Sequence, residues 1–283
     1  MKLSIQEIRA AVKNALTEDV GSGDATTLAT VPSHLQASAL MRARQPLVVA
    51  GIDFAEAAFR QLSSKIKVKK VLCDGRHART DGVILKITGP AASILTAERV
   101  ALNYIQRLSG VATLTSKFVE AVRGTGAKIL DTRKTTPGWR RFEKYAVACG
   151  GGTHYRIGLF DMVLIKDNHL VALRNEKPNA IAAAIFRARK KFPKLKIEVE
   201  ADALSQVRQA LDAGAEIILL DNMSLKQLRQ AVKMVNGRAK TEASGGVNLK
   251  TVRAIAQTGV DFISVGALTH SAPSVDIGLD FEE

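Results

Sequence analysis

Short apolar runs alternate with amphipathic stretches of helical spacing along the chain from about residue 127 onward. The apolar runs predict strands at residues 128–131, 162–166, 197–200, 217–221, 240–244 and 262–266. Helix signals lie between several of these runs: Pro178 suits a first turn, Ser224 suits an N-cap, and Gly214 and Gly259 lie where helices end. Strands that alternate with helices form a parallel sheet, either open or closed into a barrel. This half of the chain is therefore predicted to be α/β.

The first half of the chain predicts a smaller, separate unit. Apolar residues recur at helical spacing from Ile5 to Leu16, and the glycine-containing segment 21–24 interrupts the pattern. Strand-like runs follow at residues 37–41, 47–49, 66–72 and 83–87, with helices at 54–62 and 90–108. We predict an N-terminal α/β, sandwich-like domain at residues 1–110, joined by the tail 271–283, and a second α/β domain at residues 111–270.

The chain is long and apolar enough to build two cores, with 283 residues of which 46% are hydrophobic. No apolar run approaches the roughly 20 residues that span a bilayer, and the segment from Met1 to Glu7 is not an apolar signal segment. The only cysteines, Cys73 and Cys149, indicate neither a disulfide framework nor a cysteine-based zinc site. We expect a cytoplasmic protein with no membrane partner.

The net charge of +14 points to an anionic partner. Nucleic acid is one candidate, and a small, highly charged substrate drawn in by the field of the site is another. Aromatic residues make up 5% of the chain, with one tryptophan, so stacking platforms for single strands are not evident. The lysines between Lys65 and Lys70 alternate like a half-exposed strand, which is typical of a solubilising surface. We predict no nucleic-acid partner.

Cations follow the first strand of the second half. Arg133, Lys134 and Arg140 lie in the segment that closes with Pro137 and Gly138. An arginine offers a planar fork to a carboxylate, and a lysine offers a point charge to a phosphate. Taken alone, this segment could equally be a solvated basic loop. The other strand ends also carry functional side chains, and this favours an anion-binding site.

Functional side chains end the remaining strands of the second half. A parallel α/β barrel collects its functional residues at the C-terminal ends of its strands. Those ends carry Lys166, Glu200, Asp221, the run Ser244-Gly245-Gly246, and the pair Gly266-Ala267. Backbone N–H groups and hydroxyls near helix starts are suited to hold phosphate. Together the strand ends predict one anion-binding site on one face of the domain.

The helix predicted at 90–108 carries a cation on its polar face. Arg99, Asn103 and Gln106 lie roughly 140° or more around the helix from the apolar residues. From spacing alone, an ordinary exposed arginine is the better interpretation of Arg99.

Ordered motifs along the chain resemble a known family. They are Asp131-Thr-Arg-Lys-Thr-Thr-Pro-Gly, Glu143-Lys-Tyr-Ala-Val, Gly150-Gly-Gly, Ile165-Lys-Asp-Asn-His169, Ile197-Glu-Val-Glu200, Leu219-Leu-Asp-Asn-Met223 and Glu242-Ala-Ser-Gly-Gly246. The early segments Glu18-Asp-Val-Gly-Ser-Gly-Asp24 and Glu98-Arg-Val-Ala-Leu-Asn103 fit the same pattern. This set, which covers nearly the whole chain, resembles the quinolinate phosphoribosyltransferase family.

The resemblance implies a reaction and an assembly. Quinolinate and phosphoribosyl pyrophosphate, with Mg²⁺, would give nicotinate mononucleotide, pyrophosphate and carbon dioxide, a step in NAD biosynthesis. The resemblance also implies a six-stranded parallel α/β barrel and a homodimer, in which Arg99 is donated to the partner's active site. Further assembly of dimers stays open.

The resemblance assigns roles to residues of this chain. The quinolinate-binding set implied is Arg99, Arg133, Lys134, His154, Tyr155, Arg156 and Lys166. The set implied for phosphoribosyl pyrophosphate is Arg140, Glu200, Asp221, Ser244, Gly245, Gly246, Gly266, Ala267 and His270. Glu200 and Asp221 would hold Mg²⁺ directly or through water, and with Lys134 and Lys166 they form the catalytic set.

The sequence departs from the family pattern at one position. Members commonly read Asn-His-Arg after the glycine triplet, whereas this chain reads Thr153-His154-Tyr155-Arg156. Aligned on Arg156, the family's histidine falls on Tyr155, and His154 takes the place of the asparagine. A phenol donates one hydrogen bond to a carboxylate but cannot become a cation. We expect quinolinate binding to survive with altered strength.

Three alternative functions stay open. A related phosphoribosyltransferase could act on another planar acid such as nicotinate, which only the change to Tyr155 supports. A nucleic-acid-binding protein would lose affinity steeply with added salt and would have no catalytic need for Glu200 or Asp221. An inactive barrel kept as a subunit partner fits poorly with intact Lys134 and Lys166.

Overall fold

The structure is a computed structural model that describes residues 1–282. The chain packs as two compact units: residues 1–116, 137–151 and the segment from 271 onward form the first, and residues 117–136 and 152–270 form the second. Helix α4 (Ala91–Ala121) begins in the first unit and ends in the second, so the predicted boundary at residue 110 falls inside a helix. Residues 137–151, which we expected in the second domain, belong to the first unit.

Helix α4 continues past Gly110, beyond the predicted end at residue 108. A Cβ atom at Gly110 would lie 2.0 Å from the carbonyl oxygen of Pro273, so the glycine serves close backbone packing rather than helix termination. The apolar face predicted for this helix is confirmed, because its residues are all buried: Ile94, Ala97, Ala101, Ile105 and Leu108. Arg99 is exposed.

An antiparallel sheet in the order β12-β1-β5-β3 forms the frame of the first unit. Its strands are β12 (Ile277–Phe281), β1 (Gln36–Ala43), β5 (Val83–Pro90) and β3 (Lys67–Lys70). The short strands β2 (Leu47–Val48) and β4 (His77–Ala78) pair separately. The helices are α1 (Ile5–Val20), α2 (Ala25–Thr30), α3 (Ile52–Leu62), α5 (Arg140–Cys149) and most of α4. The C-terminal strand β12 therefore completes a sheet that begins near the N-terminus.

A parallel sheet in the order β6-β11-β10-β9-β8-β7 forms the second unit. Its strands are β6 (Lys128–Leu130), β7 (Val163–Ile165), β8 (Ile197–Ala201), β9 (Ile217–Asp221), β10 (Lys240–Ser244) and β11 (Phe262–Ser264). The helices are α6 (Asp167–Ala172), α7 (Ala180–Lys191), α8 (Leu204–Asp212), α9 (Leu225–Val235), α10 (Val252–Ala256) and α11 (Ala267–His270). The predicted α/β fold with six parallel strands is confirmed.

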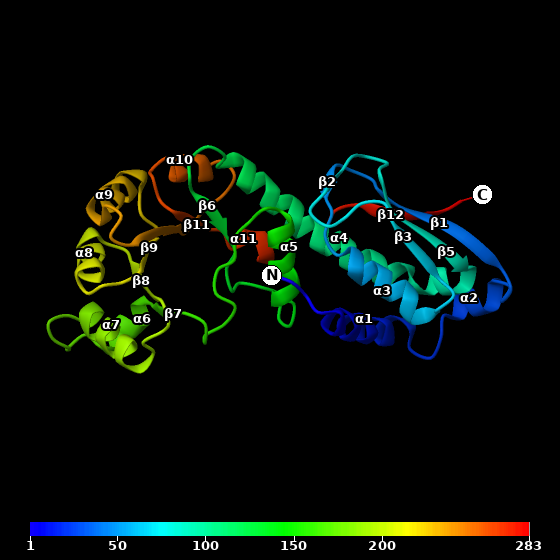
Figure 1. Ribbon diagram of the computed structural model, residues 1–283, viewed down its shortest axis with the longest axis horizontal. Helices are drawn as coiled ribbons and strands as arrows, with labels where there is room; N and C mark the ends of the chain where they lie inside the picture. The colour runs from blue at the N-terminus through cyan, green and yellow to red at the C-terminus, as the bar shows by residue number, and fades with distance from the viewer. Residues whose placement is uncertain (283) are drawn as a thin grey trace. The chain divides into compact units, whose positions relative to one another are not determined.

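The parallel sheet curves, with α7, α8 and α9 on the outer side of the curve (Figure 1). Within residues 1–282 the strand ladders run from β6 round to β7, and no ladder joins these two strands to each other. Beside β6, Leu130 instead forms an isolated bridge with Thr153. The barrel is therefore open between β6 and β7. No helix in the described part of the chain is long and apolar enough to span a membrane.

Candidate active site

A cavity of about 620 Å³ lies at the C-terminal ends of the parallel strands. Its lining comes entirely from the second unit. The lining residues are Thr132, Arg133, Lys134, Tyr155, Arg156, Leu164, Lys166, Glu200, Leu219, Asp221, Asn222, Glu242, Ser244, Gly245 and Ser264. The structure thus gathers four predicted cations, two predicted carboxylates and the start of the Ser-Gly-Gly run around one cavity.

The acidic side of the cavity is built by neighbouring strands. Glu200 on β8 and Asp221 at the end of β9 both line it. The Nζ atom of Lys166 lies 3.2 Å from Oε2 of Glu200, so one cation and one anion already meet at this wall. Asp221 Oδ2 accepts a hydrogen bond of 2.8 Å from the side-chain amide of Asn222. Each of the two carboxylates that line the cavity therefore has a polar partner in the lining.

A glycine run follows β10, beside the end of β9. Gly245 and Gly246 have φ values of 96° and 60°, in the left-handed region that glycine tolerates. A Cβ atom at Gly245 would lie 2.1 Å from the side-chain oxygen of Asn222, so a larger residue would collide with the neighbouring strand end. Exposed backbone after a strand, with Ser244 beside it, is suited to bind a phosphate group.

A second glycine brings a loop close to the last helix. A Cβ atom at Gly266 would lie 3.1 Å from Nε2 of His270 and 3.2 Å from Cδ of Lys134. The hydroxyl of Thr269 donates a hydrogen bond of 2.7 Å to the backbone carbonyl of Lys134. Short helix α11, which begins at Ala267, therefore anchors the basic loop that follows β6.

Buried Asp131 organises the segment that contains Tyr155. Its Oδ2 atom lies 3.0 Å from Nδ1 of His154, and its Oδ1 atom accepts a 2.8 Å hydrogen bond from the backbone N–H of Tyr155. The two bonds fix the backbone so that His154 stays outside the cavity lining while Tyr155 and Arg156 enter it. Asp131 thus positions the residues that follow the glycine triplet.

The floor of the cavity is acidic and buried. The Tyr155 hydroxyl donates a hydrogen bond of 2.6 Å to Oε2 of Glu198, a residue with no exposed surface. The negative charge of Glu198 acts on Glu242, which is 1% exposed and lines the cavity. Burial raises the pKa of both carboxyls, and the charge of Glu198 raises the pKa of Glu242 further. Burial also raises the pKa of the Tyr155 phenol.

The comparisons with known proteins agree on one family. The family model for the C-terminal domain of quinolinate phosphoribosyl transferase matches residues 111–280, and the N-terminal domain model matches residues 24–109. Nicotinate-nucleotide pyrophosphorylase [carboxylating] of Mycobacterium leprae is 42% identical, with 96% of each chain covered. The chain belongs to the quinolinate phosphoribosyltransferase family.

Relatives outside that genus and solved structures give the same family. The chloroplastic nicotinate-nucleotide pyrophosphorylase [carboxylating] of Oryza sativa is 42% identical over 98% of this chain and 78% of its own length. A crystal structure of NadC from Streptococcus pyogenes has a TM-score of 0.94 and 38% identity over the full length of both chains. These matches span both units, so the quinolinate phosphoribosyltransferase architecture applies to the whole chain.

Some residues predicted for the site lie outside the cavity lining. Arg99 on α4 and Arg140 at the start of α5 belong to the first unit. The rest belong to the second unit but do not line the cavity: His154, Gly246, Gly266, Ala267 and His270. Their roles in ligand binding stay predictions.

Two buried acidic residues, Glu242 in the cavity lining and Glu198 hydrogen-bonded to Tyr155, had no predicted role. Glu198 and Glu242 stand in quoted family motifs, each two positions before a predicted site residue, Glu200 or Ser244. Because strand side chains alternate between faces, this spacing places each pair on the same face of its strand. The two-residue alternation of side chains along a strand was therefore the signal that could have identified Glu198 and Glu242.

The two cavity carboxylates suit Mg²⁺ better than a tightly caged metal. Within residues 1–282, no group of three or more His, Cys, Asp or Glu side chains could hold a metal ion by itself. Mg²⁺ usually binds through one or two carboxylates, with water and substrate phosphates completing its shell. Glu200 and Asp221, at adjacent strand ends, fit that mode of binding.

Proposed function

We propose that the protein transfers a phosphoribosyl group from phosphoribosyl pyrophosphate to quinolinate and removes one carboxylate. The products would be nicotinate mononucleotide, pyrophosphate and carbon dioxide. One observation carries this proposal: a single cavity is lined by four cationic side chains and by two carboxylates at strand ends. The chain that forms this cavity belongs to the quinolinate phosphoribosyltransferase family. Several cations suit a dicarboxylate, and the carboxylates suit a ribose that develops positive charge.

In the proposed arrangement the cations hold quinolinate. Arg133, Arg156, Lys134 and Lys166 line the cavity, and each charge-assisted hydrogen bond to a carboxylate would contribute roughly 1.5–3 kcal/mol. A ligand with a single carboxylate would leave part of this set unused. The cation content therefore supports a dicarboxylate over nicotinate.

The carboxylates and the glycine run would hold phosphoribosyl pyrophosphate. Glu200 and Asp221 would bind the ribose hydroxyls and carry Mg²⁺, which would supply charge to neutralise the pyrophosphate. Ser244, Gly245 and Gly246 would bind the 5′-phosphate through hydroxyl and backbone N–H groups. Lys134 would offset negative charge growing on the leaving pyrophosphate. We propose the same role for Arg140 and a supporting phosphate contact for Gly266, Ala267 and His270.

The ring nitrogen of quinolinate would then attack the anomeric carbon as pyrophosphate leaves. Glu200 and Asp221 would stabilise the positive charge on the ribose at this step. The resulting pyridinium withdraws electrons from the adjacent carbon, so that carbon can lose its carboxylate as carbon dioxide.

The cytoplasmic location that we expected from the sequence stays a prediction.

We also propose a homodimer in which Arg99 enters the partner's site. The exposed position of Arg99 on α4 supports this, because the side chain is available to another molecule. Mixing two inactive variants, Arg99→Ala and Glu200→Ala, should restore activity, since some mixed dimers would contain one intact site. The check is turnover of the mixture against either variant alone. Turnover equal to that of the separate variants contradicts a shared site.

The reaction itself is tested with purified protein, quinolinate, phosphoribosyl pyrophosphate and Mg²⁺. Nicotinate mononucleotide, followed by chromatography, should appear from quinolinate and not from nicotinate in a parallel reaction. Product from nicotinate alone would replace quinolinate with a monocarboxylate substrate. No product from either acid would contradict the proposed reaction.

A further inference from the structure

We propose that Thr269 is a positioning residue that holds Lys134 in place to act on the pyrophosphate group. This inference rests on the proposed function, in which Lys134 offsets negative charge on the leaving pyrophosphate. Thr269 does not line the cavity, and it is 0% exposed. Its hydroxyl therefore acts on a ligand only through the protein groups that it contacts.

Lys134 lies on a loop that gives it little support of its own. Residues 131–136, between β6 and α5, form neither helix nor strand, and Lys134 is exposed. A long exposed side chain on such a loop has many conformations, and few of them place the ammonium group where charge develops. Contacts that fix the backbone of Lys134 would therefore increase turnover.

The Thr269 hydroxyl donates a hydrogen bond of 2.7 Å to the backbone carbonyl of Lys134. The carbonyl of Gly266, another acceptor near this hydroxyl, is 3.3 Å away. That carbonyl already accepts the backbone N–H groups of Thr269 and His270 at 3.1 and 3.2 Å. A hydroxyl has one proton to donate, and the shorter contact is the stronger hydrogen bond. The proton of Thr269 is therefore directed at the loop.

A second hydroxyl holds the other backbone group of Lys134. The N–H of Lys134 donates a hydrogen bond of 3.0 Å to Oγ1 of Thr132. Strand β11 pairs with β6, and the N–H of Val265 bonds to the carbonyl of Leu130 at 3.0 Å, so α11 begins beside the start of the basic loop. Lys134 is thus held by one hydroxyl from its own loop and by one from α11.

The side chain of Lys134 packs among residues proposed to contact phosphate. A Cβ atom at Gly266 would lie 3.2 Å from Cδ of Lys134 and 3.1 Å from Nε2 of His270. The lysine chain and the imidazole therefore approach the same glycine. Because Gly266 and His270 are both proposed phosphate contacts, we expect the bond from Thr269 to affect pyrophosphate more than quinolinate.

The first test is Thr269→Val, which removes the hydroxyl and nearly keeps the shape of the side chain. We expect the dissociation constant of pyrophosphate, titrated with Mg²⁺, to rise by roughly 5-fold or more and kcat to fall by roughly 10-fold. The quinolinate dissociation constant should change by less than about twofold, because Arg133, Arg156 and Lys166 remain. Thr269→Ser keeps the hydroxyl and should restore both affected values to within about twofold of the wild type.

Thr258→Val is the matched control in the same unit. The hydroxyl of Thr258, a buried residue that does not line the cavity, donates a hydrogen bond of 2.6 Å to the carbonyl of Ile255. Its loss should lower the free energy of unfolding and leave kcat and pyrophosphate affinity unchanged. A fall in kcat equal to that of Thr269→Val would overturn the proposal, because lost stability would then explain both variants.

A double-mutant cycle tests whether Thr269 acts through the Lys134 side chain. Lys134→Ala keeps the backbone carbonyl but removes the cation, so adding Thr269→Val to it should change kcat and pyrophosphate affinity by less than about twofold. The same loss in both backgrounds would overturn the proposal, since a structural role does not depend on the lysine side chain. If Thr269→Val does not fold, Thr269→Ala removes the same hydroxyl and takes its place in the cycle.

The remaining outcomes separate this inference from the proposed function. Wild-type protein that forms no nicotinate mononucleotide overturns the proposed function, whereas the pyrophosphate titration needs no turnover and still tests the role of Thr269. Wild-type pyrophosphate affinity and kcat in Thr269→Val overturn the positioning role alone. Equal weakening of quinolinate and pyrophosphate also overturns it, because Thr269 would then support the cavity as a whole. Thr269→Ser as impaired as Thr269→Val would exclude the hydroxyl.

Discussion

The two units each bury a carboxyl cluster, but the clusters differ in how their oxygens are satisfied. In the first unit, Asp74 accepts hydrogen bonds from the backbone N–H groups of Gly51 and Ile52 at 3.0 and 3.1 Å, and from the Tyr145 hydroxyl at 2.7 Å. In the second unit, Glu198 and Glu242 each keep one buried oxygen without a hydrogen-bond partner.

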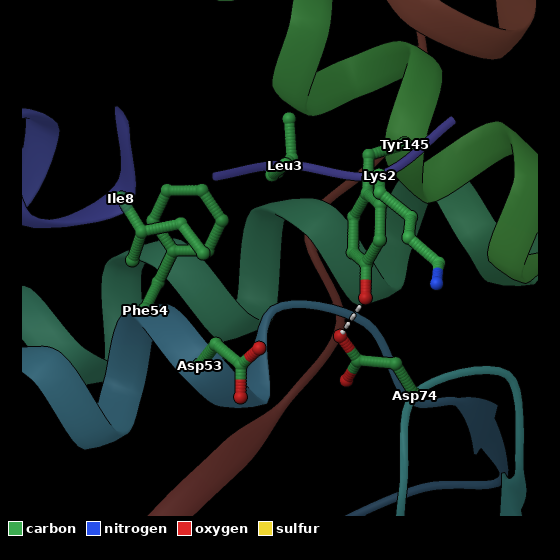
Figure 2. A pocket seen from close by; sticks show the side chains of 7 residues that line it. All are labelled: Lys2, Leu3, Ile8, Asp53, Phe54, Asp74 and Tyr145. Carbon is green, nitrogen blue, oxygen red and sulfur yellow. Dashed lines mark hydrogen bonds between the residues drawn. The ribbon is translucent and has the colours of Figure 1, made fainter. Parts of the chain in front are cut away.

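The Asp74 cluster is structural. Gly51, which precedes α3, offers no side chain to cap the helix, and Asp74 caps it from another part of the chain. The carboxyl also lies at the positive end of the helix dipole. Figure 2 shows the Tyr145 hydroxyl directed at Asp74 beside a small cavity of about 200 Å³. Burial still raises the pKa of Asp74.

The difference separates a carboxylate built for stability from a pair built for chemistry. A buried carboxylate with all its oxygens bonded to donors has little capacity to exchange protons with a ligand. Buried carboxyl oxygens that lack donors, in a pair of which one member lines the cavity, keep that capacity. Changes at Asp74 should therefore affect folding, and changes in the cavity should affect turnover.

The largest expected effect is on turnover, at the strand ends of the cavity. Glu200→Ala or Asp221→Ala should lower kcat by roughly 100- to 1,000-fold, because each removes charge that stabilises the developing ribose cation. The quinolinate dissociation constant should change far less, because the cations bind that ligand. Steady-state kinetics with direct quinolinate titration checks both values. Unchanged turnover in either variant would remove that residue from the mechanism.

The next effect is on stability, in the first unit. Tyr145→Phe removes one of the donors to Asp74, and we expect the free energy of unfolding to fall by about 1–3 kcal/mol. Turnover at saturating substrates should stay at the wild-type value, since Tyr145 does not line the substrate cavity. Urea titration and a turnover assay measure the two quantities. A large loss of turnover with unchanged stability would contradict the proposal that the Asp74 cluster serves stability and the cavity serves turnover.

A pH-dependent stability difference should mark the second unit. The pKa of Glu242 is raised well above the ordinary 4.5, so between those values the folded protein keeps a proton that the unfolded chain loses. Its contribution to stability is therefore complete below pH 4.5 and is lost as pH rises, with a slope of up to about 1.4 kcal/mol per pH unit. Glu242→Gln should show a shallower decline in urea titrations above pH 4.5. Asp74 titrates in both proteins and cancels, so identical slopes would contradict the raised pKa of Glu242.

The smallest effect is expected for Tyr155→Phe on quinolinate binding. The sequence predicted a hydrogen bond from this phenol to quinolinate, whereas the structure shows its hydroxyl donating to Glu198. We expect the quinolinate dissociation constant to change by no more than about threefold, which corresponds to about 0.7 kcal/mol. Isothermal titration measures it. A tenfold weakening would restore the direct contact with quinolinate.

Local patterns in the sequence were enough to predict the sheet and the strand-end residues. Strands β9 and β10 match their predicted ranges, and each ends in a polar residue, Asp221 or Ser244. The helix predicted to end at residue 108 runs on to Ala121, and no local pattern predicts the close approach of Pro273 to Gly110. Asp74 and Tyr145 lie 71 residues apart, and no local pattern could pair them.

The acidic floor shows a different limit. Glu198 and Glu242 share strand faces with the predicted site residues Glu200 and Ser244, and Glu242 lines the cavity whereas Glu198 does not. Their contact with each other depends on the packing of β8 and β10 on either side of β9. A charged residue on a strand suggests an exposed position until that packing is known, and so the burial of these two carboxyls was not predictable.

The most direct measurement follows the fate of one carboxylate. Quinolinate labelled with ¹³C in the carboxylate next to the ring nitrogen is mixed with the protein, phosphoribosyl pyrophosphate and Mg²⁺. The account predicts that all label leaves as carbon dioxide, in amounts equal to the pyrophosphate and the unlabelled nicotinate mononucleotide formed. Label retained in a mononucleotide product, or no product at all, would contradict it.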